Sequence, residues 1–442
     1  MAKNGDLLQR PIRPERFLAL GFLGLILAGA VLLALPVSSV AGVSIGLFES
    51  LFTATSAVCV TGLVAVDTGT VLSGFGQAVL LLLIQTGGLG FMIFATLIMM
   101  ALGRRITLKN RMLIRESMSV STLSGLMHLT AWYGALALGI ELTGALLLAI
   151  RFIPAYGWGK GLWFSLFHAV SAFCNAGFDL MGNYSSLTAY QGDPLVLSVI
   201  AVLIILGGLG FSVMMEALRL RSWKQLSLHA KVALTASAWL LAAGTVFFLL
   251  TERWEHPLMS AVFQSVTMRT AGFNSVDLAG MTDASKLLSV ILMFIGASPA
   301  STGGGVKTTT MSVLLLIVLS VIRGEEHVNV YGRRLPSGMM RRALSILFIY
   351  LAILLGGVMI LTMAEGGRYA LIDLLFEAVS ALATVGVSSI GTPQLSMISR
   401  ITLMLMMYFG RVGPLTLAFA LASRQDAARS RLRLPEEDMM IG

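Results

Sequence analysis

Four segments of the chain carry a hydroxyl side chain and a glycine at nearly constant spacing. Each begins with Phe-x-x-x-Ser/Thr, and a glycine follows six residues after the hydroxyl residue, or five in the third segment. The segments are Phe52 to Gly62, Phe167 to Gly177, Phe263 to Gly272 and Phe376 to Gly386. One such match describes only a helix end capped by glycine. Four matches predict a repeated structural unit.

The chemistry that this pattern offers is cation coordination by backbone carbonyl oxygens. Glycine adopts backbone conformations closed to other residues, and four extended segments that converge on one axis can replace the hydration shell of an ion. Negative helix ends aimed at that axis would further favour cations. We call the following the filter segments: Val60-Thr61-Gly62, Asn175-Ala176-Gly177, Thr270-Ala271-Gly272 and Thr384-Val385-Gly386.

The composition indicates that the elements around these segments lie in a bilayer. Of 442 residues, 56% are hydrophobic and 12% charged, whereas soluble domains are about 25% charged. The mean hydropathy is +0.86. The net charge of +9 comes from basic residues in short loops, which report topology and not nucleic-acid binding. Cys59 and Cys174 lie in apolar context and imply no disulfide framework.

Eight apolar stretches are long enough to cross a bilayer. They are 17–35, 77–102, 128–150, 195–218, 229–250, 286–322, 342–363 and 400–422. The first could also be a signal peptide, but its length and the many spans after it favour a retained helix. The sixth is too long for one simple span and is interrupted by a Gly-rich stretch at 296–305.

Basic and basic-poor segments alternate along the chain. The basic ones are 1–16, 104–115, 219–231, 323–342 and 424–433. An even number of spans puts both termini on the basic side, which should be cytoplasmic. Each basic-poor segment contains an apolar stretch too short to span, typical of a re-entrant helix. These stretches are 44–58, 162–174, 257–268 and 369–383.

The predicted fold is an all-α polytopic membrane protein of four helix–pore-helix–helix repeats. Eight spans and four re-entrant pore helices would surround a pseudo-fourfold pore, because non-helical backbone at membrane depth must be buried or line a water-filled cavity. The predicted division is a cytoplasmic N-terminus 1–16, repeats 17–115, 116–225, 226–335 and 336–424, and a cytoplasmic C-terminus 425–442. An intramembrane loop, 296–310, interrupts the third repeat.

On its four filter segments the chain resembles the Trk/Ktr/HKT superfamily of potassium transporters, and the resemblance covers nearly the whole sequence. It is most similar to the membrane subunit of bacterial Ktr systems. The resemblance implies potassium uptake at the cell membrane through a gated, channel-like pore, without enzyme activity. It implies K⁺ at the filter residues as transported ion, no covalent cofactor, and Na⁺ as a candidate activator. Gly62, where sodium-favouring members tend to carry Ser, favours potassium.

The resemblance also implies partners. Members pair as homodimers in membrane lipid and are gated by a cytosolic RCK-type nucleotide-binding ring, often with ATP and ADP as opposed ligands. No nucleic acid is implied.

Two elements resemble the gate of this family. One is the loop 296–310 with Gly303, Gly304, Gly305 and Lys307, and the other is Arg411 in the last span. Intramembrane charge is costly and faces a cavity or a partner. We expect Arg411 to act as an electrostatic barrier to cations, and the structural alternative is pairing with helix carbonyls or an acid such as Glu377. Val306 precedes Lys307, so no Walker A motif is present, and a plug loop is expected instead.

Further polar residues carry weaker expectations. Arg269 should pair with an acid and point away from the pore axis. Glu377 should orient a filter carbonyl or else be a capped or solvated carboxylate, and Glu141 should buttress a pore helix or face a dimer partner. The Gly-Gly-Leu-Gly-Phe runs at 87–91 and 207–211 lack dinucleotide-binding spacing and indicate close packing or a hinge.

Three other classes of function remain as alternatives. A secondary transporter with broken helices would show two related halves, and the fourfold pattern argues against it. An intramembrane enzyme would need a catalytic set, and no Ser/His/Asp, Cys/His or metal-ligand cluster appears in the sequence. A sodium-conducting or sodium/potassium member of the same superfamily is opposed only by Gly62.

Overall fold

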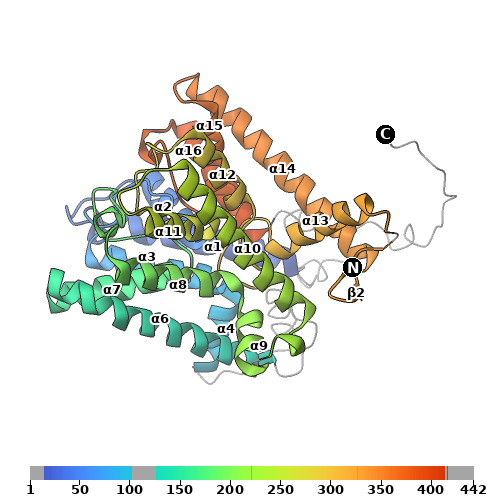
Figure 1. Cartoon of the computed structure of the whole chain (residues 1–442). Helices are drawn as coiled ribbons and strands as arrows, with labels where there is room; N and C mark the ends of the chain where they lie inside the picture. The colour runs from blue at the N-terminus through green and yellow to red at the C-terminus, as the bar shows by residue number, and fades with distance from the viewer. Residues whose placement is uncertain (1–13, 102–125, 221, 326, 414–415, 417–442) are drawn as a thin grey trace, which may run out of the picture.

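The computed structural model describes residues 14–101, 126–220, 222–325, 327–413 and 416. Four predicted features lie largely outside these residues: the N-terminus 1–16, the basic segment 104–115, the end of the last span and the C-terminus 425–442. The described part of the chain is almost entirely helical (Figure 1).

A long helix, a short helix and a second apolar helix follow one another four times. The long helices are α1 (Pro14–Ala34), α6 (Leu126–Tyr156), α10 (Leu228–Thr251) and α14 (Ser337–Glu365). The short helices are α2 (Leu47–Val58), α7 (Trp158–Phe173), α11 (Pro257–Thr270) and α15 (Leu371–Leu382). The third positions hold α3 (Gly74–Leu89) with α4 (Phe91–Ala101), α8 (Pro194–Leu209) with α9 (Phe211–Leu220), α12 (Asp283–Phe294) with α13 (Thr308–Ile322), and α16 (Met397–Val412).

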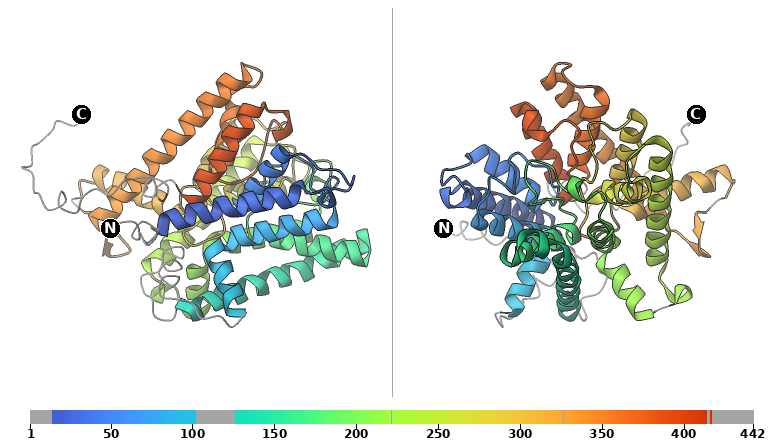
Figure 2. Two further views of the ribbon diagram at one scale, coloured as in Figure 1. Left: turned by 180° about the vertical axis from the view of Figure 1, so that it is seen from behind. Right: turned by 60° about the vertical axis from the view of Figure 1, so that its left-hand side comes forward.

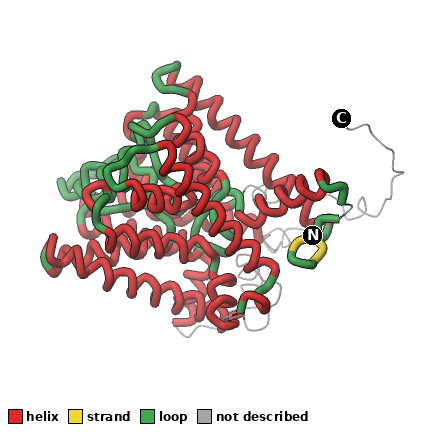
Figure 3. The backbone as a smooth tube through the Cα atoms, in the orientation of Figure 1, coloured by secondary structure: helices red, strands yellow, loops and turns green. Residues whose placement is uncertain are grey.

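The remaining elements are short. A hairpin of β1 (Asn329–Val330) and β2 (Arg333–Arg334) lies between α13 and α14. The 3₁₀ turns are η1 (Pro36–Ser38), η2 (Thr188–Tyr190), η3 (Trp223–Gln225) and η4 (Thr392–Gln394). Most loops lie at the end of the molecule opposite the residue at which α1 begins (Figure 3).

The four long helices are long and apolar enough to cross a membrane, and α8 with α9 forms a fifth candidate bent by 98°. The predicted spans 77–102 and 195–218 are each divided into two helices, as the hinge interpretation of their Gly-Gly-Leu-Gly-Phe runs allowed. They break at Gly90 (φ 82°) and Gly210 (φ 91°), where the left-handed backbone cannot continue an α-helix. The predicted break in the sixth span is present between α12 and α13.

Close packing explains why these helices are glycine-rich before they bend. A Cβ atom on Gly87 would lie less than 3.0 Å from the carbonyl oxygen of Val58, and one on Gly207 equally close to that of Phe173. Each helix therefore touches the C-terminal end of a short helix and then turns away. Both interpretations of the Gly-Gly-Leu-Gly-Phe runs, close packing and a bend, apply.

The short helices lie inside, and the long helices cover them (Figure 2). The four phenylalanines that begin the repeated segments are no more than 1% exposed: Phe52, Phe167, Phe263 and Phe376. The outer faces of the long helices instead expose large apolar side chains, such as Leu250 and Met363 at 80% each. Hydrocarbon is the solvent that suits such a surface.

Candidate ion-conducting site

The four filter segments meet in a closed ring. A Cβ atom built on each filter glycine would lie less than 3.0 Å from the carbonyl oxygen that precedes the glycine of the next segment. The pairs are Gly62 with Ala176, Gly177 with Ala271, Gly272 with Val385, and Gly386 with Thr61. The last segment thus meets the first, and the tertiary structure brings all four predicted segments together.

The backbone of the ring requires glycine. The φ angles of Gly62, Gly177, Gly272 and Gly386 are 93°, 68°, 82° and 90°, in the region that favours glycine. Three segments also begin with a non-glycine residue at positive φ: Val60, Asn175 and Thr384. Such residues cost about 1–3 kcal/mol each and persist only where the surroundings enforce them. The third segment is one residue shorter, and Thr270 still belongs to α11.

The hydroxyl residue shared by the four repeats ties each filter segment to its short helix. In the first and fourth repeats the hydroxyl accepts a hydrogen bond from the filter glycine N–H; in the second and third it donates to the carbonyl after the glycine. The distances are 3.0 Å for Ser56 and Gly62, 2.6 Å for Ser171 and Phe178, 2.8 Å for Thr267 and Phe273, and 3.0 Å for Ser380 and Gly386.

The ring offers oxygen ligands and a negative potential. Three short helices end two residues before their filter segments and α11 ends at the first residue of its own, so their C-terminal partial charges lie beside the ring. The Thr61 and Thr384 hydroxyls are buried and have no hydrogen-bond partner among the described residues. No group of three or more His, Cys, Asp or Glu side chains in the described ranges could hold a metal ion. The oxygen atoms present at the ring include its backbone carbonyls and the Thr61 and Thr384 hydroxyls.

Four side-chain contacts near the N-terminal ends of the short helices also join each repeat to the next. Two are neutral hydrogen bonds and two are ion pairs, and the last again joins the fourth repeat to the first. They are Trp163 to Gln77 at 2.9 Å, Gln191 to Ser260 at 3.2 Å, Lys286 to Asp373 at 2.9 Å and Arg400 to Glu49 at 2.7 Å. We call these contacts the outer latches, and they were not anticipated from the sequence.

The loop between α12 and α13 lies directly against the ring. The Thr302 hydroxyl lies 2.7 Å from the Asn175 side-chain amide and 3.0 Å from the carbonyl oxygen of Phe173. Gly304 packs against the Thr384 side chain, and a Cβ there would overlap the Thr384 hydroxyl. Thr302 was not singled out in the sequence, although a hydroxyl in a Gly-rich break was the available signal.

The predicted gate residues hold this loop in place. Lys307 Nζ donates to the carbonyl oxygen of Gly303 at 2.6 Å. The Arg411 guanidinium donates to the carbonyl oxygens of Thr302 and Gly87, and to that of Gly88 at 3.2 Å. The carbonyl partners of Arg411 thus come from the helix α3 and from the loop, Glu377 is not its partner, and these contacts are compatible with the expected electrostatic barrier. Because one of these carbonyls belongs to the loop, Arg411 binds the loop to the first repeat.

Glu377 is fully buried and accepts hydrogen bonds, so the capped carboxylate is the alternative observed and the solvated one is not. Its Oε1 accepts hydrogen bonds from the Ser388 hydroxyl at 2.6 Å, the Ser389 N–H at 2.9 Å and the Ile390 N–H at 3.2 Å. It thus holds the segment after the fourth filter segment and does not contact a filter carbonyl.

Arg269 and Glu141 have neutral partners. Arg269 donates to the Ser237 hydroxyl on α10 at 3.2 Å and forms no ion pair with any described residue, so the expected acid partner is wrong. Glu141 accepts from Gln85 Nε2 at 3.0 and 3.1 Å. The Cys174 thiol lies 3.4 Å from Gln85 Oε1, so this cluster supports the end of α7, as the buttress interpretation expected.

Two acidic side chains lie in the loops after the first two filter segments. Asp67 accepts hydrogen bonds from the Gly69 N–H at 2.9 Å and the Tyr184 N–H at 3.2 Å. Burial raises the pKa of Asp179 to about 6; the Met181 N–H opposes this shift and the nearby Asp67 carboxylate adds to it. Two acids so placed add negative charge beside the ring.

This fold and ring define a class: a helical membrane protein that buries converging backbone carbonyls. The sequence matches the TrkH family, described as a cation transport protein, over residues 28–431. This chain therefore belongs to the TrkH family of multi-pass membrane transporters and is a transport protein, not an enzyme.

Curated relatives match nearly full length. The chain is 41% identical to the Ktr system potassium uptake protein B of Bacillus subtilis, over 97% of both chains. It is 38% identical to the potassium/sodium uptake protein NtpJ of Enterococcus hirae, over 98% of both. The crystal structure of the potassium transporter TrkH from Vibrio parahaemolyticus has a TM-score of 0.72, with 17% identity over 95% of this chain and 87% of that one. That likeness shows a shared fold.

We expect the stability of the protein to depend on the proton of Asp179. Its native pKa is about 6 against a usual 3.8, so between these values the native state holds a proton that the unfolded chain has released. Stability should therefore decrease as pH rises from about 4 to about 6 and level off above. Asp179→Asn should remove this decrease in thermal unfolding curves. The exposed Asp277→Asn is the control, and an unchanged decrease in Asp179→Asn would contradict the assignment.

Proposed function

We propose that this protein mediates potassium uptake through a gated, channel-like pore, with K⁺ as the transported ion at the filter segments. The observation that carries the proposal is the closed ring in which each filter glycine meets a carbonyl of the next repeat. A cation that loses its water there would find carbonyl oxygens from all four repeats.

The names of the relatives support potassium and leave one alternative. Two relatives, from Bacillus subtilis and Vibrio alginolyticus, are named potassium uptake proteins, at 41% and 38% identity. A third is named a potassium/sodium uptake protein. Conduction of both ions is therefore the second candidate, and Na⁺ as an activator of K⁺ uptake is part of the same question. Uptake of each ion, measured with and without the other, separates these cases.

The loop between α12 and α13 would be the gate. It lies against the second, third and fourth filter segments and is held by Arg411. Conduction then requires this loop to move, and Gly303, Gly304 and Gly305 give it small side chains against the ring.

The proposed partners are a second copy of the chain and a cytosolic RCK-type nucleotide-binding ring. Support comes from the relatives named as components of a Ktr system. Co-expression with such a ring, followed by purification and mass measurement of the assembly, tests both partners; a monomer that never retains the ring would contradict them.

Both termini are proposed to face the cytoplasm, because the basic segments 219–231 and 323–342 lie on that side of the predicted topology. A membrane-impermeant thiol reagent should label a cysteine at the exposed Ser44 in intact cells but not one at Ser337. The reverse pattern would overturn the orientation.

Gly62→Ser should weaken potassium selectivity. Its side chain would lie within 3.0 Å of the Ala176 carbonyl oxygen at a φ of 93°. The strain of about 1–3 kcal/mol displaces carbonyl oxygens of the ring, and each kcal/mol by which this disfavours K⁺ relative to Na⁺ lowers the K⁺-to-Na⁺ uptake ratio about fivefold. Growth of a potassium-uptake-deficient bacterial strain at low K⁺, together with uptake of both ions, measures this effect.

Gly46→Ser is the matched control, since Gly46 has the same φ of 93° with nothing within 4 Å of its built Cβ. Expression and thermal stability of each variant separate misfolding from altered selectivity. A stable Gly62→Ser protein with wild-type uptake and selectivity would show that the ring is not the filter.

Arg411→Gln should increase K⁺ flux. It removes charge-assisted hydrogen bonds to the loop and to the first repeat, which contribute about 1.5–3 kcal/mol each, or about tenfold in the open fraction. Flux into proteoliposomes measures this, with the exposed Arg323→Gln as control. Arg411→Lys keeps the charge but loses the planar fork. High flux in both variants would mean that the hydrogen bonds of Arg411 keep the loop in place. High flux in Arg411→Gln alone would mean that its positive charge is an electrostatic barrier. Low flux in both variants would contradict a gating role.

A further inference from the structure

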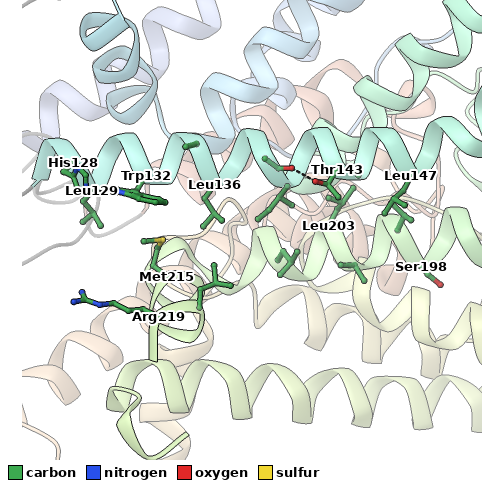
Figure 4. A pocket seen from close by; sticks show the side chains of 18 residues that line it. His128, Leu129, Trp132, Leu136, Thr143, Leu147, Ser198, Leu203, Met215 and Arg219 are labelled. Atoms are coloured by element: carbon green, nitrogen blue, oxygen red, sulfur yellow. Dashed lines mark hydrogen bonds between the residues drawn. The ribbon is translucent and has the colours of Figure 1, made fainter. Parts of the chain in front are cut away.

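A groove of about 1270 Å³ lies between α6 and the bent pair α8–α9, apart from the ring (Figure 4). Ordinary small-molecule pockets hold roughly 300–1,000 Å³. Along most of its length the groove is lined by apolar side chains, among them Leu136, Leu147 and Leu203. It is open to the surroundings: Leu147 is 42% exposed and Val202 52%.

One end of the groove differs from the rest. His128 and Trp132 on α6 lie at this end, and Arg219 on α9 lies at the same end on the opposite wall (Figure 4). The Trp132 indole N–H donates to His128 Nε2 at 2.7 Å, and the ring of Trp132 is half exposed. Arg219 is exposed and forms no ion pair with the described side chains. The groove therefore has an apolar body and a single cationic end.

That cationic end lies on the basic side of the predicted topology, where Arg219 begins the segment 219–231. Tryptophan is enriched where membrane meets water, and basic residues at that depth attract anionic headgroups. The apolar length of the groove matches an acyl chain, the indole of Trp132 matches the membrane interface, and Arg219, which has no ion pair among the described residues, matches the phosphate.

We propose that this groove binds one anionic phospholipid. An acyl chain lies along α6 and α8, and the phosphate lies at Arg219 with Trp132 beside it. A second copy of the chain is the less suitable occupant, because an apolar helix would leave the guanidinium without a counter-charge.

The groove also contacts both arms of the α8–α9 bend. Leu206 lines it from α8, and Met215 and Leu218 line it from α9. On its other side the same bend holds the loop between α12 and α13. The Phe211 N–H donates to the Ala300 carbonyl at 3.0 Å, and the Thr302 N–H donates to the Gly207 carbonyl at 3.1 Å.

A lipid that contacts both arms resists a change in the 98° bend and so stabilises the loop in its present position. This regulatory step rests on the proposed gate, whereas binding of the lipid does not.

The experiment is native mass spectrometry of the full-length protein in detergent with phosphatidylglycerol or phosphatidylcholine. Two variants change the groove. Arg219→Gln removes the charge. Gly139→Leu fills the apolar body without a clash, because nothing lies within 4 Å of a Cβ built on Gly139. The matched controls are Arg342→Gln, an exposed arginine outside the groove, and Gly24→Leu, a helical glycine with equally open surroundings.

The wild type should retain one phosphatidylglycerol in preference to phosphatidylcholine. Arg219→Gln should reduce that preference about fivefold, the factor for one basic residue at an anionic surface. Gly139→Leu should lose the bound lipid of either kind, and both controls should match the wild type. Equal retention of the two lipids, or groove variants that behave as wild type, would overturn the site. Dissociation of a dimer by Gly139→Leu would overturn it in favour of a subunit interface.

K⁺ flux into liposomes with and without phosphatidylglycerol tests the coupling separately. Higher flux without phosphatidylglycerol, or in Arg219→Gln, supports it. Flux that is independent of the lipid overturns the coupling. No flux by the wild type in any lipid would overturn the proposed function together with the coupling, and the mass measurement would still decide the binding site.

Discussion

Backbone carbonyls that are not paired with backbone N–H groups cannot face lipid, and this constraint governs the whole molecule. An unsatisfied backbone group in hydrocarbon costs several kcal/mol. The four filter segments are such backbone, so they must be buried by protein on every side. The long helices α1, α6, α10 and α14 provide that cover. The shared hydroxyl of each repeat and the outer latches hold each filter segment in its place.

The glycines follow from the same constraint. The ring is narrow because each filter glycine touches a carbonyl of the next repeat, and a Cβ atom there would separate the repeats. The second helices approach the ring equally closely at Gly87 and Gly207 before they bend. Small residues therefore set the dimensions of the ring, and large side chains are displaced to the outer surface of the molecule.

The loop between α12 and α13 closes this arrangement from one side. Non-helical backbone at this depth is tolerated because its own groups find partners: Gly296 N–H pairs with Val306 O at 3.0 Å, and Ala297 N–H with Gly304 O at 3.1 Å. Arg411 contributes to the stability of both the loop and its own side chain. A guanidinium in a protein interior needs acceptors, and loop carbonyls that point away from the ring need donors. The Arg411 guanidinium finds an acceptor in the Thr302 carbonyl oxygen, and that carbonyl finds a donor in Arg411.

The sequence by itself determined the membrane class, the four repeats and the position of every filter segment. The length of the apolar stretches and the Phe-x-x-x-Ser/Thr spacing are local properties, so they can be recognised without knowledge of the fold. It also indicated the break in the sixth span, since several glycines close together with a proline weaken a helix.

Only the tertiary structure decided which groups meet. The hydroxyl partner of Arg269, the carbonyl partners of Arg411 and the contact of Thr302 with Asn175 all join residues far apart in the chain. Partners of this kind depend on three-dimensional distance, and a one-dimensional pattern contains spacing along the chain but no distance across the pore.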